Sequence, residues 1–313
     1  MSGTEDRVRR LAALGCDILR FSTPDLEQAE LLGALAGMVD IPLVADVHFD
    51  WRIALRCMDF PIAKIRVNPG NLGEPWKLRE VAAKASDRGV PIRIGVNAGS
   101  LPADLREEPD RANAIVTAAE REVAALDELG FGAVIVSMKA SGVVDTVSAN
   151  RLFASRHDIP LHIGVTEAGP LVQGCVRSAV AMHQLLSDGI GDTLRVSLSD
   201  EPENEVVAGN EIVALASGVR TSADIVSCPR CGRATFDTHA FTARWSDRIY
   251  GIRKAVTIAV MGCVVNGPGE AKHADLGITG AGDKVMVFRH GQIVRTCAPE
   301  EADTVFGEEL SRI

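Results

Sequence analysis

The sequence has no apolar run long enough to span a bilayer. Its longest apolar stretch, Ala255–Val265, is interrupted by Thr257 and Gly262, whereas a membrane-spanning helix needs about 20 consecutive apolar residues. The opening residues, MSGTEDRVRRLAALG, contain no apolar segment of the kind that a secretory signal carries. We therefore expect a cytoplasmic protein without a membrane partner.

Positive charge is also scarce. The chain has 33 Lys and Arg residues against 42 Asp and Glu residues, which gives a net charge of −9. A general nucleic-acid-binding protein carries a basic face, so we expect no nucleic-acid partner. Hydrophobic residues make up 46% of the chain and charged residues 24%, which excludes a mostly disordered protein.

No GxGxxG motif follows the first apolar run, which disfavours a dinucleotide-binding fold. Short apolar, β-branched runs alternate instead with amphipathic helical stretches, a pattern that predicts parallel strands. The predicted strands are Asp17–Ser22, Pro42–Phe49, Ala63–Pro69, Pro91–Ala98, Gly132–Lys139, Leu161–Ala168 and Thr193–Ser199. Seven such units favour an α/β fold of the TIM-type (β/α) barrel class, which closes with eight strands. The chain begins directly with a helical pattern at Glu5–Leu14, so we expect this barrel to lack its first strand.

The pattern changes near Thr221. This change predicts a barrel over residues 1–220 and a small α+β domain over residues 221–313. The predicted elements of the second domain are strands at Ser222–Ser227 and Ala255–Met261, a helix at Phe241–Gly251, and a hairpin of Lys284–Arg289 with Gln292–Thr296.

Basic side chains interrupt the predicted barrel strands, which should be almost continuously apolar. These cations are Arg20, Arg66, Arg93, Lys139 and Arg195. The chief acids near them are Asp46 and Glu167, so positive charge is in surplus. Such a surplus is costly to bury without a matching anion, and the guanidinium group binds phosphate oxygens in pairs. We predict a compact, multiply anionic ligand at the carboxyl ends of the strands.

Three of the seven cysteines form a pattern. Cys228 and Cys231 lie in CPRCGR, Cys263 follows Cys231 after 32 residues, and Glu270 follows seven residues later. A structural zinc site would need a second CxxC or a suitably spaced histidine, and neither follows Cys263. Three thiolates with an exchangeable fourth ligand suit an iron–sulfur cluster. The spacing favours a cluster, and it leaves a zinc site or unliganded thiols as alternatives.

Eight segments carry a resemblance to a known family. They are VADVHFDWRIAL, IRVNPGN, PIRIGVNAGSL, SMKAS, VTEAG, GIGDTLRVSL, CPRCGR and GCVVNGPGEA. In these segments the chain resembles the 4-hydroxy-3-methylbut-2-enyl diphosphate synthase family, in its two-domain bacterial form. The resemblance implies reductive ring opening and dehydration of 2-C-methyl-D-erythritol 2,4-cyclodiphosphate in the methylerythritol phosphate route to isoprenoids. It also implies that flavodoxin or ferredoxin delivers single electrons.

The resemblance further implies roles for individual residues. A [4Fe-4S] cluster would be held by Cys228, Cys231, Cys263 and Glu270. The substrate-binding positions would be Arg20, Arg66, Asn68, Arg93, Asn97, Lys139, Arg195 and Ser197. Asp46, Glu167 and Asn266 would lie around the reacting carbons, with Glu167 transferring a proton. The family is a homodimer in which the cluster domain of one subunit covers the barrel mouth of the other, and its members begin with a segment that carries the first strand.

Two other functions stay open on the residues alone. One is a phosphate-ester-binding barrel with a zinc-stabilised dimerisation domain, which metal content would distinguish from a cluster enzyme. The other is an inactive paralogue that has lost its first strand. The complete set of cluster ligands and strand arginines argues against such decay, because no structural need would retain all of them.

Overall fold

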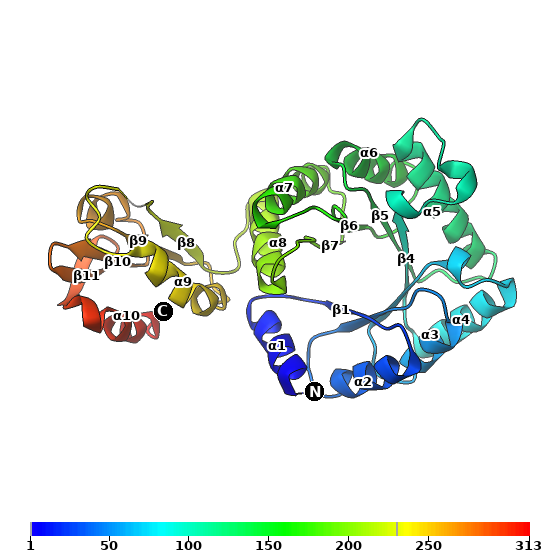
Figure 1. The fold of residues 1–313 in the computed structure, drawn as a ribbon, viewed down its shortest axis with the longest axis horizontal. Helices are drawn as coiled ribbons and strands as arrows, with labels where there is room; N and C mark the ends of the chain where they lie inside the picture. Colours follow the sequence, from blue (N-terminus) through cyan, green and yellow to red (C-terminus); the bar gives the residue numbers. More distant parts are fainter. Residues whose placement is uncertain (1, 230) are drawn as a thin grey trace. The chain divides into compact units, whose positions relative to one another are not determined.

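The chain folds into two units, each with its own hydrophobic core. The computed structural model describes residues 2–229 and 231–313, without the side chains of Ser2 and Glu270. The first unit is Met1–Gly218 and the second is Val219–Ile313 (Figure 1). Across the described ranges, no helix is both long and apolar enough to cross a bilayer.

Strands and helices alternate through the first unit, and the helices surround the strands (Figure 1). The strands are β1 (Leu19–Ser22), β2 (Leu43–Asp46), β3 (Lys64–Val67), β4 (Ile92–Asn97), β5 (Val134–Lys139), β6 (His162–Ile163) and β7 (Thr193–Leu194). The helices are α1 (Ser2–Ala13), α2 (Leu26–Ala36), α3 (Trp51–Cys57), α4 (Pro75–Arg88), α5 (Arg111–Asp127), α6 (Val143–Ala154), α7 (Leu171–Ser187) and α8 (Pro202–Ser217). Strands β1 to β5 pair in parallel and in sequence order, a bridge joins β5 to Leu161, and β6 pairs with β7. The predicted α/β architecture with a parallel sheet is confirmed.

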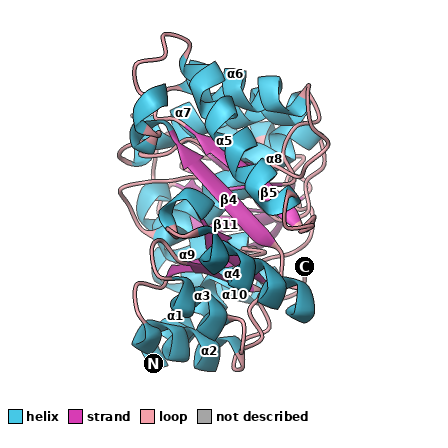
Figure 2. Cartoon of the chain, turned by 90° about the vertical axis from the view of Figure 1, so that its right-hand side faces the viewer, coloured by secondary structure: helices cyan, strands magenta, loops and turns pink. Residues whose placement is uncertain are grey.

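Short polar side chains begin several of these helices. Asp25, Asp50 and Asp110 each accept a hydrogen bond from a backbone N–H in the first turn of α2, α3 and α5. Such caps satisfy donors that a helix cannot pair internally. Helix α5 then packs against β4 and β5 (Figure 2).

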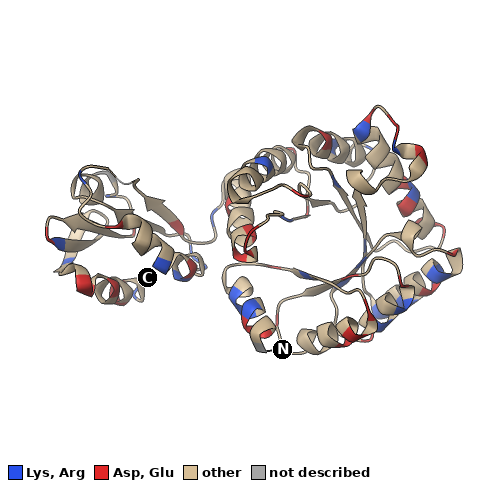
Figure 3. Ribbon diagram, viewed as in Figure 1, with Lys and Arg blue, Asp and Glu red and all other residues tan. Residues whose placement is uncertain are grey.

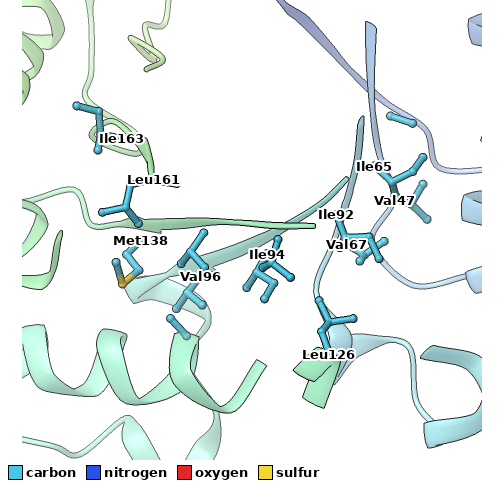
Figure 4. Close-up of a cluster of buried hydrophobic side chains, with 14 of the residues drawn as sticks. Val47, Ile65, Val67, Ile92, Ile94, Val96, Leu126, Met138, Leu161 and Ile163 are labelled. Atoms are coloured by element: carbon cyan, nitrogen blue, oxygen red, sulfur yellow. The ribbon is translucent and has the colours of Figure 1, made fainter. Parts of the chain in front are cut away.

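The strands of the first unit have one apolar face and one polar face. Charged residues lie on the outer helices and also on the strands around the barrel axis (Figure 3). On the face toward the helices, Ile65 lies beside Ile92 in register, and both are fully buried. Leu126 of α5 belongs to this apolar layer (Figure 4). Because side chains alternate along a strand, the intervening positions face the barrel axis, and they include Lys64, Arg66 and Arg93.

Two strands of the first unit have a single neighbour each. In the described part of the chain, β1 pairs only with β2, and β7 pairs only with β6. The helices on either side are nevertheless joined, because Asn210 Nδ2 donates to Leu14 O at 3.0 Å and Arg7 Nη2 donates to Glu203 at 3.0 Å. A cavity of about 560 Å³ lies along these strand edges, with walls that include Leu11, Leu19, Leu194, Val206 and Gly209.

Strand β7 is shorter than the predicted strand, which extended to Ser199. Arg195 N still donates to Ile163 O of β6 at 3.0 Å, but Ser199 N donates to Gly169 O, which lies in a loop. The ladder has support on one side only, and the chain leaves it after Arg195.

In its described residues, the second unit combines a five-stranded sheet with two α-helices and the short helical turns Val265–Glu270 and Pro299–Glu301. Strands β8 (Asp224–Ser227), β9 (Thr257–Met261) and β10 (Leu276–Ala281) are parallel, and β11 (Lys284–Arg289) and β12 (Gln292–Cys297) continue the sheet antiparallel. The helices are α9 (Thr238–Tyr250) and α10 (Ala302–Leu310). The predicted hairpin is confirmed, whereas β10 was not predicted. Aromatic rings join the helices, with Phe306 at 5.0 Å from Phe241 and 4.9 Å from Trp245 between ring centroids.

Truncation of Phe306 should destabilise the second unit. Its side chain is fully buried among Phe241 and Trp245, so Phe306→Ala should lower the free energy of unfolding by about 3–5 kcal/mol. The measurement is denaturant unfolding followed by Trp245 fluorescence, with Trp51 and Trp76 replaced by Phe. Ile293→Ala, at a half-exposed position on β12, is the control. A loss for Phe306→Ala no larger than that of the control would contradict this packing.

Candidate active site

Five cations face one another on the inner side of the barrel strands. They are Arg20, Arg66, Arg93, Lys139 and Arg195. Register places Arg66 of β3 beside Arg93 of β4, and Asn97 beside Lys139 of β5. Burial lowers the pKa of Arg20, and the nearby charges of Arg195, Arg93 and Arg66 lower it further. The structure thus brings the cations that the sequence singled out into one group.

One buried carboxylate lies between two of these arginines. Asp46 is 2% exposed; it accepts a hydrogen bond from Arg66 Nη1 at 3.0 Å and another from Arg20. Arg66 Nη1 also lies 3.0 Å from His48 Nδ1, and burial together with Arg66 and Arg20 lowers the pKa of His48. Both oxygens of Asp46 are engaged, so this carboxylate orients the arginines.

The positive charges of Arg93 and Lys139 are the least balanced by nearby carboxylates. Arg93 is 8% exposed, and within the described part of the chain its Nε has no hydrogen-bond partner. Burial, followed by the charges of Arg93 and Arg195, holds the pKa of Lys139 well below its ordinary value. A buried donor without a partner is unfavourable. The arrangement is therefore suited to an anion that supplies oxygen acceptors to several cations at once.

Two glycines allow the backbone to approach these cations. A Cβ atom at Gly95 of β4 would lie 2.6 Å from Arg66 Nε, and one at Gly164 would lie 2.4 Å from Arg195 O and 3.2 Å from Lys139 Nζ. Neither position can take a side chain without displacing its neighbours. The glycines therefore help to keep the cations close to the barrel axis.

The other predicted barrel residues occupy the loops after the strands. Asn68 accepts a hydrogen bond from Gly70 N at 3.1 Å, and Ser197 is half-buried just beyond β7. Glu167 is exposed and has a backbone φ of 52°, a left-handed conformation that is rare outside glycine. Backbone strain of this kind concentrates at functional sites.

The sequence reasoning missed three polar residues that adjoin this group. Lys64 and His162 line the cavity together with Arg93, and burial lowers the pKa of His162 well below its ordinary value. Lys64 could have been found, because it lies two positions before Arg66 on β3 and shares that residue's face. His162 could have been found as a polar residue within the predicted strand Leu161–Ala168. Glu205 of α8 also contacts Arg195, and no sequence pattern pointed to it.

In the second unit, the pairing of β8 with β9 brings two cysteines together. Cys228 N donates to Val260 O. Gly262, the residue before Cys263, donates its N–H to Cys228 Sγ at 3.1 Å. The loop that carries the exposed Cys231 returns to the same place, because Thr235 N donates to Gly262 O at 2.8 Å. All three cysteines therefore lie in segments that meet at the carboxyl ends of β8 and β9.

The surroundings of Cys263 favour a thiolate. Backbone hydrogen bonds from Asn266 and Val265 lower the pKa of Cys263, and the guanidinium of Arg233 lowers it further. The thiolate is the form that binds metals. Among the described side chains, no group of three His, Cys, Asp or Glu is already arranged around a metal position. The side chain of Glu270, predicted as the fourth ligand, lies outside the described residues.

Family comparisons agree with this division into two units. The GcpE TIM-barrel domain model matches residues 1–210, and the GcpE protein C-terminal domain model matches residues 224–312. The chain belongs to the GcpE family. A relative from Treponema pallidum is 53% identical over 98% of this chain and 81% of its own length, and one from Geobacter sulfurreducens is 47% identical over 97% and 87%. Both are named 4-hydroxy-3-methylbut-2-en-1-yl diphosphate synthase (flavodoxin), so the family resemblance in the sequence is confirmed.

Gly95→Ala in this GcpE chain should weaken anion binding without removing a charge. The new methyl group would overlap the Arg66 guanidinium and push it away from Asp46. We expect the Kd for inorganic pyrophosphate, measured by calorimetry, to rise about 10-fold, since about 1.4 kcal/mol corresponds to that factor. Gly99→Ala is the matched control, because no atom lies within 4 Å of its added Cβ. Equal affinities for the two variants would refute the close packing of Gly95 on Arg66.

Binding of pyrophosphate should take up protons through Lys139. Burial and the neighbouring arginines lower the pKa of Lys139, and a bound anion raises that pKa toward the ordinary value of about 10.4. The complex then holds more protons than the free protein between these two values, so affinity falls as the pH rises through this window. Calorimetry in buffers of different ionisation enthalpy should show less proton uptake for Lys139→Met than for the unmodified chain. The same uptake in both would contradict a change in the protonation of Lys139 on binding.

Proposed function

We propose that this GcpE chain is a 4-hydroxy-3-methylbut-2-en-1-yl diphosphate synthase. It reductively opens and dehydrates 2-C-methyl-D-erythritol 2,4-cyclodiphosphate, giving 4-hydroxy-3-methylbut-2-enyl diphosphate in the methylerythritol phosphate pathway. The observation that carries the proposal is the group of five inward-facing cations with too few carboxylates to balance them. A ligand with two phosphoryl groups supplies the oxygens and the charge that this group lacks.

The chain's own residues bind and orient this substrate. Arg20, Arg66, Arg93, Lys139 and Arg195 bind the phosphoryl oxygens, together with Asn68, Asn97 and Ser197. Asp46 keeps Arg20 and Arg66 in place through its two hydrogen bonds. Glu167, exposed on its strained loop, delivers the proton with which the departing oxygen leaves as water.

The second unit fits an iron–sulfur cofactor. Cys228, Cys231 and Cys263 would hold a [4Fe-4S] cluster with Glu270 as the fourth ligand, and Asn266 lies beside Cys263. N–H groups directed at Cys228 and Cys263 stabilise thiolates and tune such clusters. When bound, the cluster supplies one-electron reduction.

Partners follow from this chemistry. Flavodoxin, which the names of the relatives include, or ferredoxin would deliver the electrons singly. We also propose a homodimer in which the second unit of one subunit covers the barrel mouth of the other. Exposed apolar side chains follow the barrel strands at Phe49, Trp76, Val144 and Val172, and Val264 is exposed beside Cys263. Their burial against another subunit would be favourable.

We further propose that the barrel, over residues 1–220, lacks the first of the eight strands that close a barrel of this type. Among the residues that the structure describes, β1 and β7 each pair with a single strand, and this supports the proposal together with the cavity along their other edges. Residues 221–313 form the cluster domain. We place the protein in the cytoplasm, where its seven free cysteines would stay reduced.

Metal analysis tests the cofactor. Protein purified without oxygen should contain about four irons and matching acid-labile sulfide per chain. Cys263→Ser should lose most of this iron, whereas Cys175→Ser, on α7 of the barrel, should retain it. About one zinc per chain without sulfide would favour the structural-zinc alternative and overturn the redox function.

A further inference from the structure

A carboxylate on α8 joins two parts of the barrel site. Glu205 accepts hydrogen bonds from Arg195 Nε and Nη2, each at 3.4 Å, and from Leu198 N at 2.8 Å. The Glu205 side chain is only 16% exposed. One side chain thus contacts both a substrate-binding arginine and the loop that carries Ser197.

The segment from Arg195 to Leu198 is anchored through its backbone, since Arg195 N donates to Ile163 O and the following Ser199 N donates to Gly169 O, whereas the Arg195 side chain is held by Glu205. The segment lies beyond the end of β7, whose outer edge has no strand neighbour in the described residues. On the other side, Leu198 packs on α7, where a Cβ at Gly174 would lie 2.4 Å from Leu198 Cδ2. Without Glu205, the Arg195 side chain would be free to move away from the repulsion of the neighbouring cations.

We propose that Glu205 is a positioning residue that holds Arg195 and the Ser197 loop ready for the diphosphate. This inference rests on the proposed function, since it concerns the same anion site. Glu205 does not need to touch the substrate. It fixes the guanidinium direction and the loop backbone before the anion arrives, which lowers the entropic cost of binding.

The direction in which anion affinity changes when Glu205 is replaced distinguishes a positioning role from a purely electrostatic one. If Glu205 acted only as a nearby negative charge, its removal would strengthen the binding of an anion. If it positions Arg195, its removal weakens binding. Glu205→Gln keeps the size of the side chain and an oxygen that can accept a hydrogen bond from Leu198 N. The substitution therefore removes mainly the ion pair with Arg195.

The experiment is calorimetric titration of the full chain, purified without oxygen, with inorganic pyrophosphate. We expect Glu205→Gln to raise the Kd about 10-fold, and to raise the KM for the cyclic diphosphate with little change in kcat. In an Arg195→Ala background, Glu205→Gln should change the Kd less than about twofold, because residues that act through one contact are not additive. Glu203→Gln is the matched control, because Glu203 lies on the same helix and pairs with Arg7 and Arg10 of α1.

The outcomes are distinguishable. Unchanged or tighter pyrophosphate binding by Glu205→Gln would overturn the positioning role and leave the proposed function intact. If Glu205→Gln raised the Kd for pyrophosphate by the same factor in the Arg195→Ala background, Glu205 would not act through Arg195, and the proposal would be overturned. Failure of the unmodified chain to bind pyrophosphate or the cyclic diphosphate would overturn the proposed diphosphate site and the role of Glu205 together.

Discussion

Positive charge on the inner face of the barrel strands is the constraint on which the rest of the first unit depends. A barrel interior of this type is normally filled by bulky apolar side chains. Here Arg66 and Arg93 are buried side by side in register, and Arg93 Nε has no partner among the described residues. The apolar layer between strands and helices, with Ile65 and Ile92, must supply the stability that this interior does not. The protein therefore maintains a destabilising interior that an anion would relieve.

Much of this arrangement follows from the sequence because it is local. Short apolar runs that alternate with helical stretches predicted the parallel strands, and the basic residues that interrupt these runs predicted the group of cations. The position of Lys64, two residues before Arg66, carried this information as well, although it was not used. Side-chain alternation depends only on the backbone of a strand, so the residues that share a face can be predicted without knowledge of the tertiary fold.

The remainder depends on contacts between distant segments. Strand β10 has the sequence LGITGA, whose glycines are typical of a loop, yet the ring of Phe288 covers Gly277 and makes the strand part of the core. Glu205 meets Arg195 because α8 returns across the end of β7, and the spacing of the two residues does not indicate it. The predicted end of β7 at Ser199 was wrong because the length of a strand depends on its neighbours.

The same surplus of charge has a consequence for the release of product under the proposed function. A cyclic diphosphate has one ionised oxygen on each phosphoryl group, and opening the ring frees a further oxygen on the terminal phosphoryl group. The product is then the more highly charged of the two ligands, so five cations with Asp46 and Glu205 as their carboxylate partners attract it more strongly. A site that captures substrate by charge alone would thus retain its product. A carboxylate that competes with the product for the guanidinium groups, as Asp46 does, moderates this retention, because Arg20 and Arg66 can return to Asp46 when the product leaves.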